Sequence, residues 1–501
     1  MIKRLIAILL VVVISVTLFS CGKREENPSG TDDYVLPTQV ISADIAFPYM
    51  SSDSLAPYSA VSTTNRNLIP VMYESLYVPT KDGKGKAVLA ADGKVEGKTV
   101  TIKLVDGVCF SDGVELNAAY VKASFEFAKK NDYYKSSLTD IDSVKVVDNL
   151  TVIFNLSREN PFALNILNFP IIRISNGKSI GSGKYKLQYL EDAPYFQVNT
   201  IHREYKESFN KQIALYDMAG ISSPIYPFKA NKISVYSQDL SFEKYMNLSS
   251  ETVSTPMNNF VYLGVNCRWA GSLTSIDWVR QAINVGIDRS SVGASSFLGQ
   301  TDAVVTPYRT EFYQLNTENL PSLSGETRRA IDILERNGYN KFNSEGIRTN
   351  GTTALKVNIL VCTENEYKRA VADAVKKSLE DLGFGVSITE KKTLDDFKKA
   401  LNEGHFGLYI GETQFSDDYN LQEFFKKNGQ LSYGINEDFF PHYESYRNGT
   451  DSFMTFVESF ETEVPFIPLF YRKSIVSINP NITGINTEAI YSSACLWQLQ
   501  D

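Results

Sequence analysis

The chain has 501 residues, of which 43% are hydrophobic, 12% aromatic and 22% charged, so it can bury a sizeable core. Its length suggests about three domains, and its composition excludes a disordered or collagen-like protein. The formal net charge of −8 argues against binding to nucleic acid, because proteins that bind phosphate backbones usually carry a basic face.

Residues 1–20 are predicted to be a signal peptide. Lys3 and Arg4 precede an apolar run from Leu5 to Leu18. A helix of that length reaches about 21 Å at ~1.5 Å per residue. This is shorter than the ~30 Å hydrocarbon core of a membrane, so the run is typical of a signal sequence and not of a stable span.

The signal region ends in Leu18-Phe19-Ser20-Cys21-Gly22, which resembles the bacterial lipobox. In that motif the cysteine is linked to diacylglycerol and becomes the new N-terminus. We therefore expect lipidation at Cys21 and a polar, flexible tether over residues 21–35. The alternative is a chance cysteine after an ordinary signal peptide.

The N-terminal half is rich in predicted strands, with one helix from Asn117 to about Lys130. The strands are expected at Thr99–Leu104, Val144–Val147, Thr151–Leu156 and Lys184–Tyr189. Apolar residues at helical spacing then predict helices over Ser275–Ile287 and Glu326–Asn337.

The clearest pattern, from Leu355 to Glu412, predicts a β-α-β-α-β unit of an open parallel sheet. Its strands are expected at Leu355–Cys362, Gly385–Thr389 and Phe406–Gly411. One helix is expected over Glu364–Leu382, and another starts at Thr393 as its N-cap and ends just before Gly404. Because such sheets bind ligands at the carboxyl ends of their strands, the loop after Gly411 is the predicted functional site.

Neither cysteines nor histidines form a metal-binding pattern. Cys109, Cys267, Cys362 and Cys495 are widely separated, with no C-x-x-C motif, and sequence alone does not decide whether they pair. We expect no metal site and no cofactor.

A secreted hydrolase is the rival class, because Gly177-Lys178-Ser179-Ile180-Gly181 matches G-x-S-x-G. A nucleophile elbow needs its serine on a strand-to-helix turn, whereas a glycine-rich stretch and a strand pattern follow Ser179. The adjacent acids Asp417 and Asp418 should point apart on a loop. We predict no catalytic residues.

Four motifs, in order, resemble family 5 of the bacterial extracellular solute-binding proteins. They are Phe110-Ser111-Asp112-Gly113, Gly181-Ser182-Gly183-Lys184-Tyr185, Tyr262-Leu263-Gly264-Val265-Asn266 with Val279-Arg280-Gln281-Ala282, and Pro465-Phe466-Ile467-Pro468-Leu469-Phe470-Tyr471. They span most of the mature chain. The stretch from Tyr205 to Asn259 is shortened relative to the family pattern.

The resemblance implies an α/β, two-lobed periplasmic-binding-protein fold (type II, extra-domain class) with a mixed α+β domain inserted in the first lobe. The expected divisions are lobe 1 over residues 36–75, the inserted domain over 76–175, lobe 1 again over 176–262, lobe 2 over 263–470 and a return to lobe 1 over 471–501. Tyr262–Asn266 and Pro468–Tyr471 are the candidate hinge strands.

The resemblance also implies a peptide site. Phe415-Ser416-Asp417-Asp418-Tyr419-Asn420 resembles the family loop whose aspartate pairs with a peptide ammonium, which assigns that role to Asp418, with Phe415 and Tyr419 beside it. Val61, Ser62 and Thr63 match residues that line the peptide backbone. Ala56 replaces the aspartate usual in that segment.

The sequence thus predicts a monomeric, lipid-anchored receptor on the outer side of a bacterial cytoplasmic membrane. It would capture a small peptide and deliver it to the permease and ATPase subunits of an ATP-driven importer. The alternatives are the same receptor class for a metal chelate or an oligosaccharide, and a secreted hydrolase.

Overall fold

The structure is a computed structural model that describes residues 45–479 except 208–209, 241–243 and 249. The signal peptide, Cys21 and Cys495 lie outside the described residues. Cys109, Cys267 and Cys362 are free thiols.

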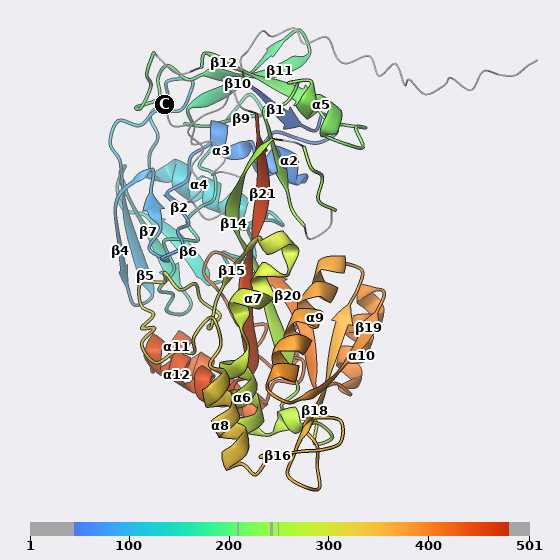
Figure 1. Ribbon diagram of the computed structural model, residues 1–501. Coiled ribbons are helices and arrows are strands. Elements are labelled where there is room, and N and C mark those ends of the chain that lie inside the picture. Colours follow the sequence, from blue (N-terminus) through green and yellow to red (C-terminus); the bar gives the residue numbers. More distant parts are fainter. Residues whose placement is uncertain (1–44, 208–209, 241–243, 249, 480–501) are drawn as a thin grey trace, which may run out of the picture. The chain divides into compact units, whose positions relative to one another are not determined.

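The C-terminal half contains the predicted β-α-β-α-β unit (Figure 1). Its elements are β18 (Lys356–Cys362), α9 (Glu366–Asp381), β19 (Gly385–Lys391), α10 (Leu394–Glu403) and β20 (Leu408–Gln414). Strand β18 pairs in parallel with both β19 and β20, which confirms the predicted unit. Strand β20 begins two residues later than predicted and runs three residues further.

Local chemistry explains where these helices begin and end. The Thr393 hydroxyl accepts a hydrogen bond from the Asp396 amide and caps α10. Gly383 and Gly404 follow the two helices at φ 91° and 72°, a left-handed conformation that costs glycine little.

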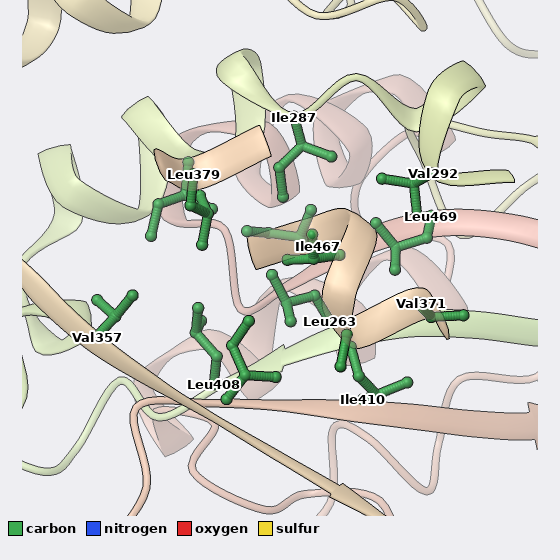
Figure 2. Close-up of a cluster of buried hydrophobic side chains, with 14 of the residues drawn as sticks. Leu263, Ile287, Val292, Val357, Val371, Leu379, Leu408, Ile410, Ile467 and Leu469 are labelled. Atoms are coloured by element: carbon green, nitrogen blue, oxygen red, sulfur yellow. The ribbon is translucent and has the colours of Figure 1, made fainter. Parts of the chain in front are cut away.

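These strands belong to a seven-stranded sheet with the order β13-β21-β14-β20-β18-β19, in which β15 also pairs with β21. Its other strands are β13 (Val235–Gln238), β14 (Glu251–Val265), β15 (Thr301–Ala303) and β21 (Phe466–Ile478). The helices of this half are α6 (Asp277–Gly286), α7 (Arg289–Ala294), α8 (Thr327–Arg336), α11 (Phe440–Arg447) and α12 (Phe453–Glu463). An aliphatic core from β14, β18, β20, β21, α6, α7 and α9 fills the space between strands and helices (Figure 2).

Strands β14 and β21 run side by side over most of their length (Figure 1). Their register shifts between Pro256 and Phe260 and again at Val261 and Tyr262. The predicted hinge residues lie in these two strands except Asn266, which follows β14, and the larger irregularity lies just upstream of Tyr262.

A second core lies within residues 76–171. Its sheet has the order β4-β5-β7-β6 and packs on one helix, and its elements are β4 (Ala90–Glu96), β5 (Thr99–Leu104), α4 (Ala118–Ala128), β6 (Ile141–Val146) and β7 (Thr151–Leu156). Helix α4 begins one residue after the predicted start at Asn117, which caps it. Two short strands, β2 (Tyr77–Val78) and β3 (Lys86–Ala87), precede this sheet.

A third core joins the chain's first described residues to residues 172–235 and to the end of β21. Its sheet has the order β1-β12-β11-β10. The elements are β1 (Ala46–Tyr49), α2 (Thr63–Arg66), α3 (Ile69–Met72), β10 (Tyr185–Leu190), β11 (Ala193–Val198), β12 (Gln212–Asp217) and α5 (Ile225–Lys229).

The Gly181-Ser182-Gly183 motif has a packing role. A Cβ atom on Gly181 would lie 2.1 Å from the Met72 carbonyl oxygen, and one on Gly183 would lie 2.5 Å from the Met72 carbonyl carbon. Only glycine allows the backbone to approach α3 so closely. Ser179 lies in β9 (Lys178–Ile180), which forms a hairpin with β8 (Arg173–Ser175), so it is not on a strand-to-helix turn.

The remaining short elements lie in the C-terminal half. They are the 3₁₀ turns η1 (Leu273–Ser275), η2 (Phe297–Gly299) and η3 (Glu437–Phe439), and the strand pair β16 (Lys341–Phe342) and β17 (Arg348–Thr349).

Candidate ligand-binding site

A tight turn follows β20 and presents the two adjacent acids. The Tyr419 amide donates to the Ser416 carbonyl at 3.0 Å, and Tyr419 adopts φ 50°. The Phe415 amide donates to the Asn258 carbonyl of β14 at 2.9 Å, which ties the turn to the neighbouring strand. Asp417 and Asp418 occupy the two central positions, and their carboxylates bind different groups.

Asp418 is buried and has a cation beside it. Its side chain is 2% exposed and accepts a hydrogen bond from Asn160 Nδ2 at 3.2 Å and another from the Ser416 hydroxyl. Burial raises the pKa of Asp418, and the neighbouring Arg447 guanidinium opposes that rise. Asp418 is therefore part of a charge-balanced cluster.

Arg447 connects Asp418 to the second core. It pairs with the carboxylate of Asp140 and donates to the Tyr443 hydroxyl at 2.9 Å. Asp140 also pairs with Arg158 Nε at 3.2 Å. Burial by itself lowers the pKa of Arg447, but Tyr443, Asp418 and Asp140 outweigh it and hold that pKa above its ordinary value.

Asp417 has only neutral partners. Its carboxylate accepts hydrogen bonds from Asn168 Nδ2 and, at 2.7 Å, from Asn258 Nδ2. Its carbonyl oxygen accepts from Asn165 Nδ2 at 3.3 Å. Within the described residues no Lys, Arg or His nitrogen lies within 4.0 Å of this carboxylate. Burial raises the pKa of Asp417 to about 7, and the neighbouring Asp418 charge adds to the rise.

Phe415 and Tyr419 hold the turn in place. Both are buried in an aromatic cluster. The Phe415 ring stacks on Phe260 at 5.0 Å between centroids, and the Tyr419 ring lies 5.2 Å from that of Phe162 in the same cluster. The two aromatic residues predicted for the site are thus brought together with Asp418, with their rings packed inside the protein.

The predicted residues Val61, Ser62 and Thr63 lie at the start of α2. Val61 is 74% exposed, and the amides of Val61 and Ser62 donate to the Asp53 carboxylate at 3.1 and 2.7 Å. Burial acts to raise the pKa of Asp53, but hydrogen bonds from Ser62, Ser54 and Val61 hold it below its usual value. Asp53 therefore anchors the segment in which Ala56 replaces the family's aspartate.

Aromatic residues after α4 link α2 to the acidic turn. The guanidinium of Arg66 lies 4.5 Å from the centre of the Tyr133 ring, and the Tyr133 and Tyr134 rings lie 4.9 Å apart. Burial raises the pKa of Tyr134, whereas Arg66 lowers it and Asp417 raises it. Arg66 and Asp417 therefore both lie within electrostatic reach of the Tyr134 hydroxyl.

Several residues of this site were not predicted from the sequence. Arg66 lies three residues after Thr63 in the segment that the resemblance selected, and that proximity is the one signal that could have found it. Nothing in the sequence pairs Arg447 or Asn160 with a residue of the turn. Within the described part of the chain, no group of three His, Cys, Asp or Glu side chains could hold a metal ion.

Solved structures with the same fold define the class. An ABC transporter substrate-binding protein from Sinorhizobium meliloti aligns with a TM-score of 0.70 at 17% identity, covering 88% of this chain and 96% of that one. NikA from Brucella suis in complex with Fe(III)-EDTA aligns with a TM-score of 0.63 at 18% identity, covering 91% and 98%. The fold is that of the two-lobed type II periplasmic binding proteins.

The family follows from the sequence comparison. The model of "Bacterial extracellular solute-binding proteins, family 5 Middle" matches residues 86–432. The chain belongs to this family, whose members are extracellular or periplasmic receptors of ATP-driven importers and not enzymes.

Curated relatives match over part of their length. The glutathione-binding protein GsiB of Salmonella typhi is 32% identical over 162 residues, which cover 29% of this chain and 32% of GsiB. Across such relatives the chain spans from about a third to about half of their length. Between residues 45 and 479, as far as they are described, no helix is long and apolar enough to cross a membrane.

Proposed function

We propose that this protein captures a small peptide and delivers it to the permease and ATPase subunits of an importer. The observation that supports a peptide most directly is the acidic turn after β20, which presents two carboxylates at the carboxyl end of a sheet strand. Polar side chains from the other half of the chain contact both acids. A carboxylate held away from water favours a cationic partner, and every free peptide carries an ammonium group.

The proposed ligand-binding residues are those of the turn, with Phe415, Asp418 and Tyr419, and the segment Val61, Ser62 and Thr63. The relative GsiB is named for binding glutathione, a small peptide with one ammonium and two carboxylate groups. A binding protein of this class gains affinity by closing over its ligand, because the ligand shifts the open–closed equilibrium by its preference for the closed state.

Native mass spectrometry tests the proposal. The full-length protein in detergent would be mixed with random-sequence tripeptides, glutathione, Fe(III)-EDTA and a mixture of oligosaccharides. We expect tripeptides or glutathione to be retained. Retention of the chelate or the sugars alone would contradict the peptide proposal.

We propose further that the receptor is a lipoprotein anchored through Cys21. Cells grown with labelled palmitate should label the wild-type protein and leave Cys21→Ala unlabelled and released from the membrane. Equal labelling of both forms would contradict the anchor, whatever the ligand.

A further inference from the structure

We propose that the ligand carries both an ammonium and a carboxylate group, that Asp417 binds the ammonium, and that Arg66 binds the carboxylate. This inference rests on the proposed function and makes its site more specific. It assigns the charge recognition to Asp417, the neighbour of the acid that sequence resemblance selects, and to an arginine on α2.

Next to Asp417 lies a buried acceptor without a donor, and no Lys, Arg or His nitrogen of the described residues lies within 4.0 Å of the Asp417 carboxylate. Asn258 uses its amide nitrogen to bind the Asp417 carboxylate, while its own amide oxygen has no hydrogen-bond partner among the described residues. Asn258 is 4% exposed, so that oxygen is also hidden from water. A buried acceptor without a donor is unfavourable. An ammonium group would supply donors to this oxygen and to the carboxylate together.

Arg66 shows the opposite deficiency. Its guanidinium has five N–H donors, and its contacts are the face of Tyr133 and a long hydrogen bond of 3.4 Å from Nη2 to the Thr63 hydroxyl. No carboxylate of the described residues pairs with it. A planar fork of donors that lacks an acceptor matches a carboxylate, which it can bind through two parallel hydrogen bonds.

Arg66 and Asp417 are both related to one residue, Tyr134. Tyr133 contacts Arg66, Tyr134 contacts Tyr133, and both Arg66 and Asp417 act electrostatically on the Tyr134 hydroxyl. Tyr133 is 41% exposed, and Asp417 is partly buried. A short zwitterion with its positive end at Asp417 and its negative end at Arg66 would neutralise both charges.

Asp418 has less reason to bind an external cation. Arg447 already supplies a positive charge beside it, and Asn160 and Ser416 donate to its two oxygens. A ligand ammonium at Asp418 would have to compete with that arginine. The role that the geometry favours for Asp418 is to hold the turn so that Asp417 faces the ligand.

Peptides blocked at one end test the contributions of the ligand's ammonium and carboxylate groups to affinity separately. The tripeptide that the wild-type protein retains most strongly would be prepared free, N-acetylated and C-amidated, and its affinity measured by isothermal titration calorimetry. The variants are Asp417→Asn and Arg66→Gln, with Asp418→Asn to test the acid that sequence resemblance selects and Arg328→Gln, exposed on α8, as the control for a lost arginine.

We expect Asp417→Asn to weaken binding of the free and C-amidated peptides by about tenfold or more and to leave the N-acetylated peptide unchanged. Arg66→Gln should weaken the free and N-acetylated peptides to a similar degree and leave the C-amidated peptide unchanged. Arg328→Gln should bind all three forms as the wild type does.

Other outcomes overturn the inference in recognisable ways. If Asp418→Asn shows the ammonium-dependent loss and Asp417→Asn does not, the assignment fails while the peptide receptor stands. A variant that loses all three forms equally, or none, also overturns the assignment of its residue. If the wild type retains no peptide but does retain the chelate or a sugar, the proposed function fails as well.

Discussion

The acidic turn separates two polar clusters that differ in one property, the presence of an internal counter-charge. On one side Asp418, Arg447 and Asp140 form a buried set in which each carboxylate has a guanidinium nearby. On the other side, as far as the chain is described, the Asp417 carboxylate has amide partners alone, and Arg66 has an aromatic ring in place of a carboxylate.

The difference indicates which charged side chains stabilise the fold by pairing with each other and which are available to pair with a ligand. Buried charges are costly unless they are paired, so a paired set stabilises one arrangement of the chain. An unpaired carboxylate and an unpaired guanidinium remain unfavourable until another molecule supplies their partners. The same turn thus has a structural acid and, next to it, an acid available for binding.

Removing Arg447 should produce the largest effect on stability. Arg447→Ala would leave Asp418 without a positive charge and Asp140 with Arg158 alone, and we expect a loss of about 3–5 kcal/mol in the free energy of unfolding. Urea denaturation followed by circular dichroism measures it. A loss equal to that of the exposed control Arg328→Ala would show that the paired cluster does not stabilise the fold.

Neutralising each acid in turn compares the clusters directly. At pH 8, Asp418→Asn should lower the free energy of unfolding by about 1–3 kcal/mol, because the amide leaves Asn160 Nδ2 or the Ser416 hydroxyl without an acceptor, while the charge that it removes is already partly balanced by Arg447. Asp417→Asn should leave stability unchanged or raise it, because the folded state no longer has to hold an ionised carboxylate without a cation. Thermal unfolding of both variants checks this, and equal losses would contradict the contrast.

Peptide affinity should depend on pH through Asp417. Its pKa in the folded protein is about 7, raised from the ordinary value, so the proton is favoured in the unliganded site. An ammonium ligand requires the ionised form, and affinity should therefore fall by about tenfold per unit as pH decreases below 7. It should fall again above about pH 8, where the peptide's own ammonium loses its proton.

The charged and titratable groups that face Asp417 are Asp418, Tyr134, Tyr419 and, through Tyr134, Arg66. Asp417→Asn isolates the contribution of Asp417, because the variant should lose the acidic limb of the profile. Calorimetric titrations between pH 5 and about 9 measure both proteins. An acidic limb that persists in the variant would assign the titration to Asp418.

The smallest effect is expected at Thr63, at the edge of the unpaired cluster. Its hydroxyl accepts a 3.4 Å hydrogen bond from Arg66. Thr63→Val should change the free energy of unfolding by less than about 0.5 kcal/mol, because the bond is long and exposed. Thermal unfolding measures this change, and a loss above about 1 kcal/mol would mean that Arg66 depends on Thr63 for its position.

The sequence was most informative where one local pattern decides one local structure. Helical spacing, the Thr393 cap and the left-handed Gly404 placed α10 to within a residue, and strand composition placed β18 and β19. The parallel topology of this unit also predicted the functional site in the turn after β20. These features depend on neighbours a few positions away, so they can be read without the fold.

The partners of the turn could not be read in this way. Asn160 and Asp418 are 258 residues apart, and Arg447 and Asp140 are 307 apart. Phe415 and Tyr419 were expected beside a ligand, and their rings are packed in an aromatic cluster. Burial and pairing are properties of the assembled chain, which no local pattern encodes.

By itself the sequence determined the family, through four motifs in order, and the β-α-β-α-β unit whose strand end presents the acids. Only the tertiary structure decided which of two adjacent acids has a cation, because that depends on where Arg447 and Arg66 come to lie after distant segments pack. A carboxylate's role follows from the charges around it in space, and those charges come from all parts of the chain.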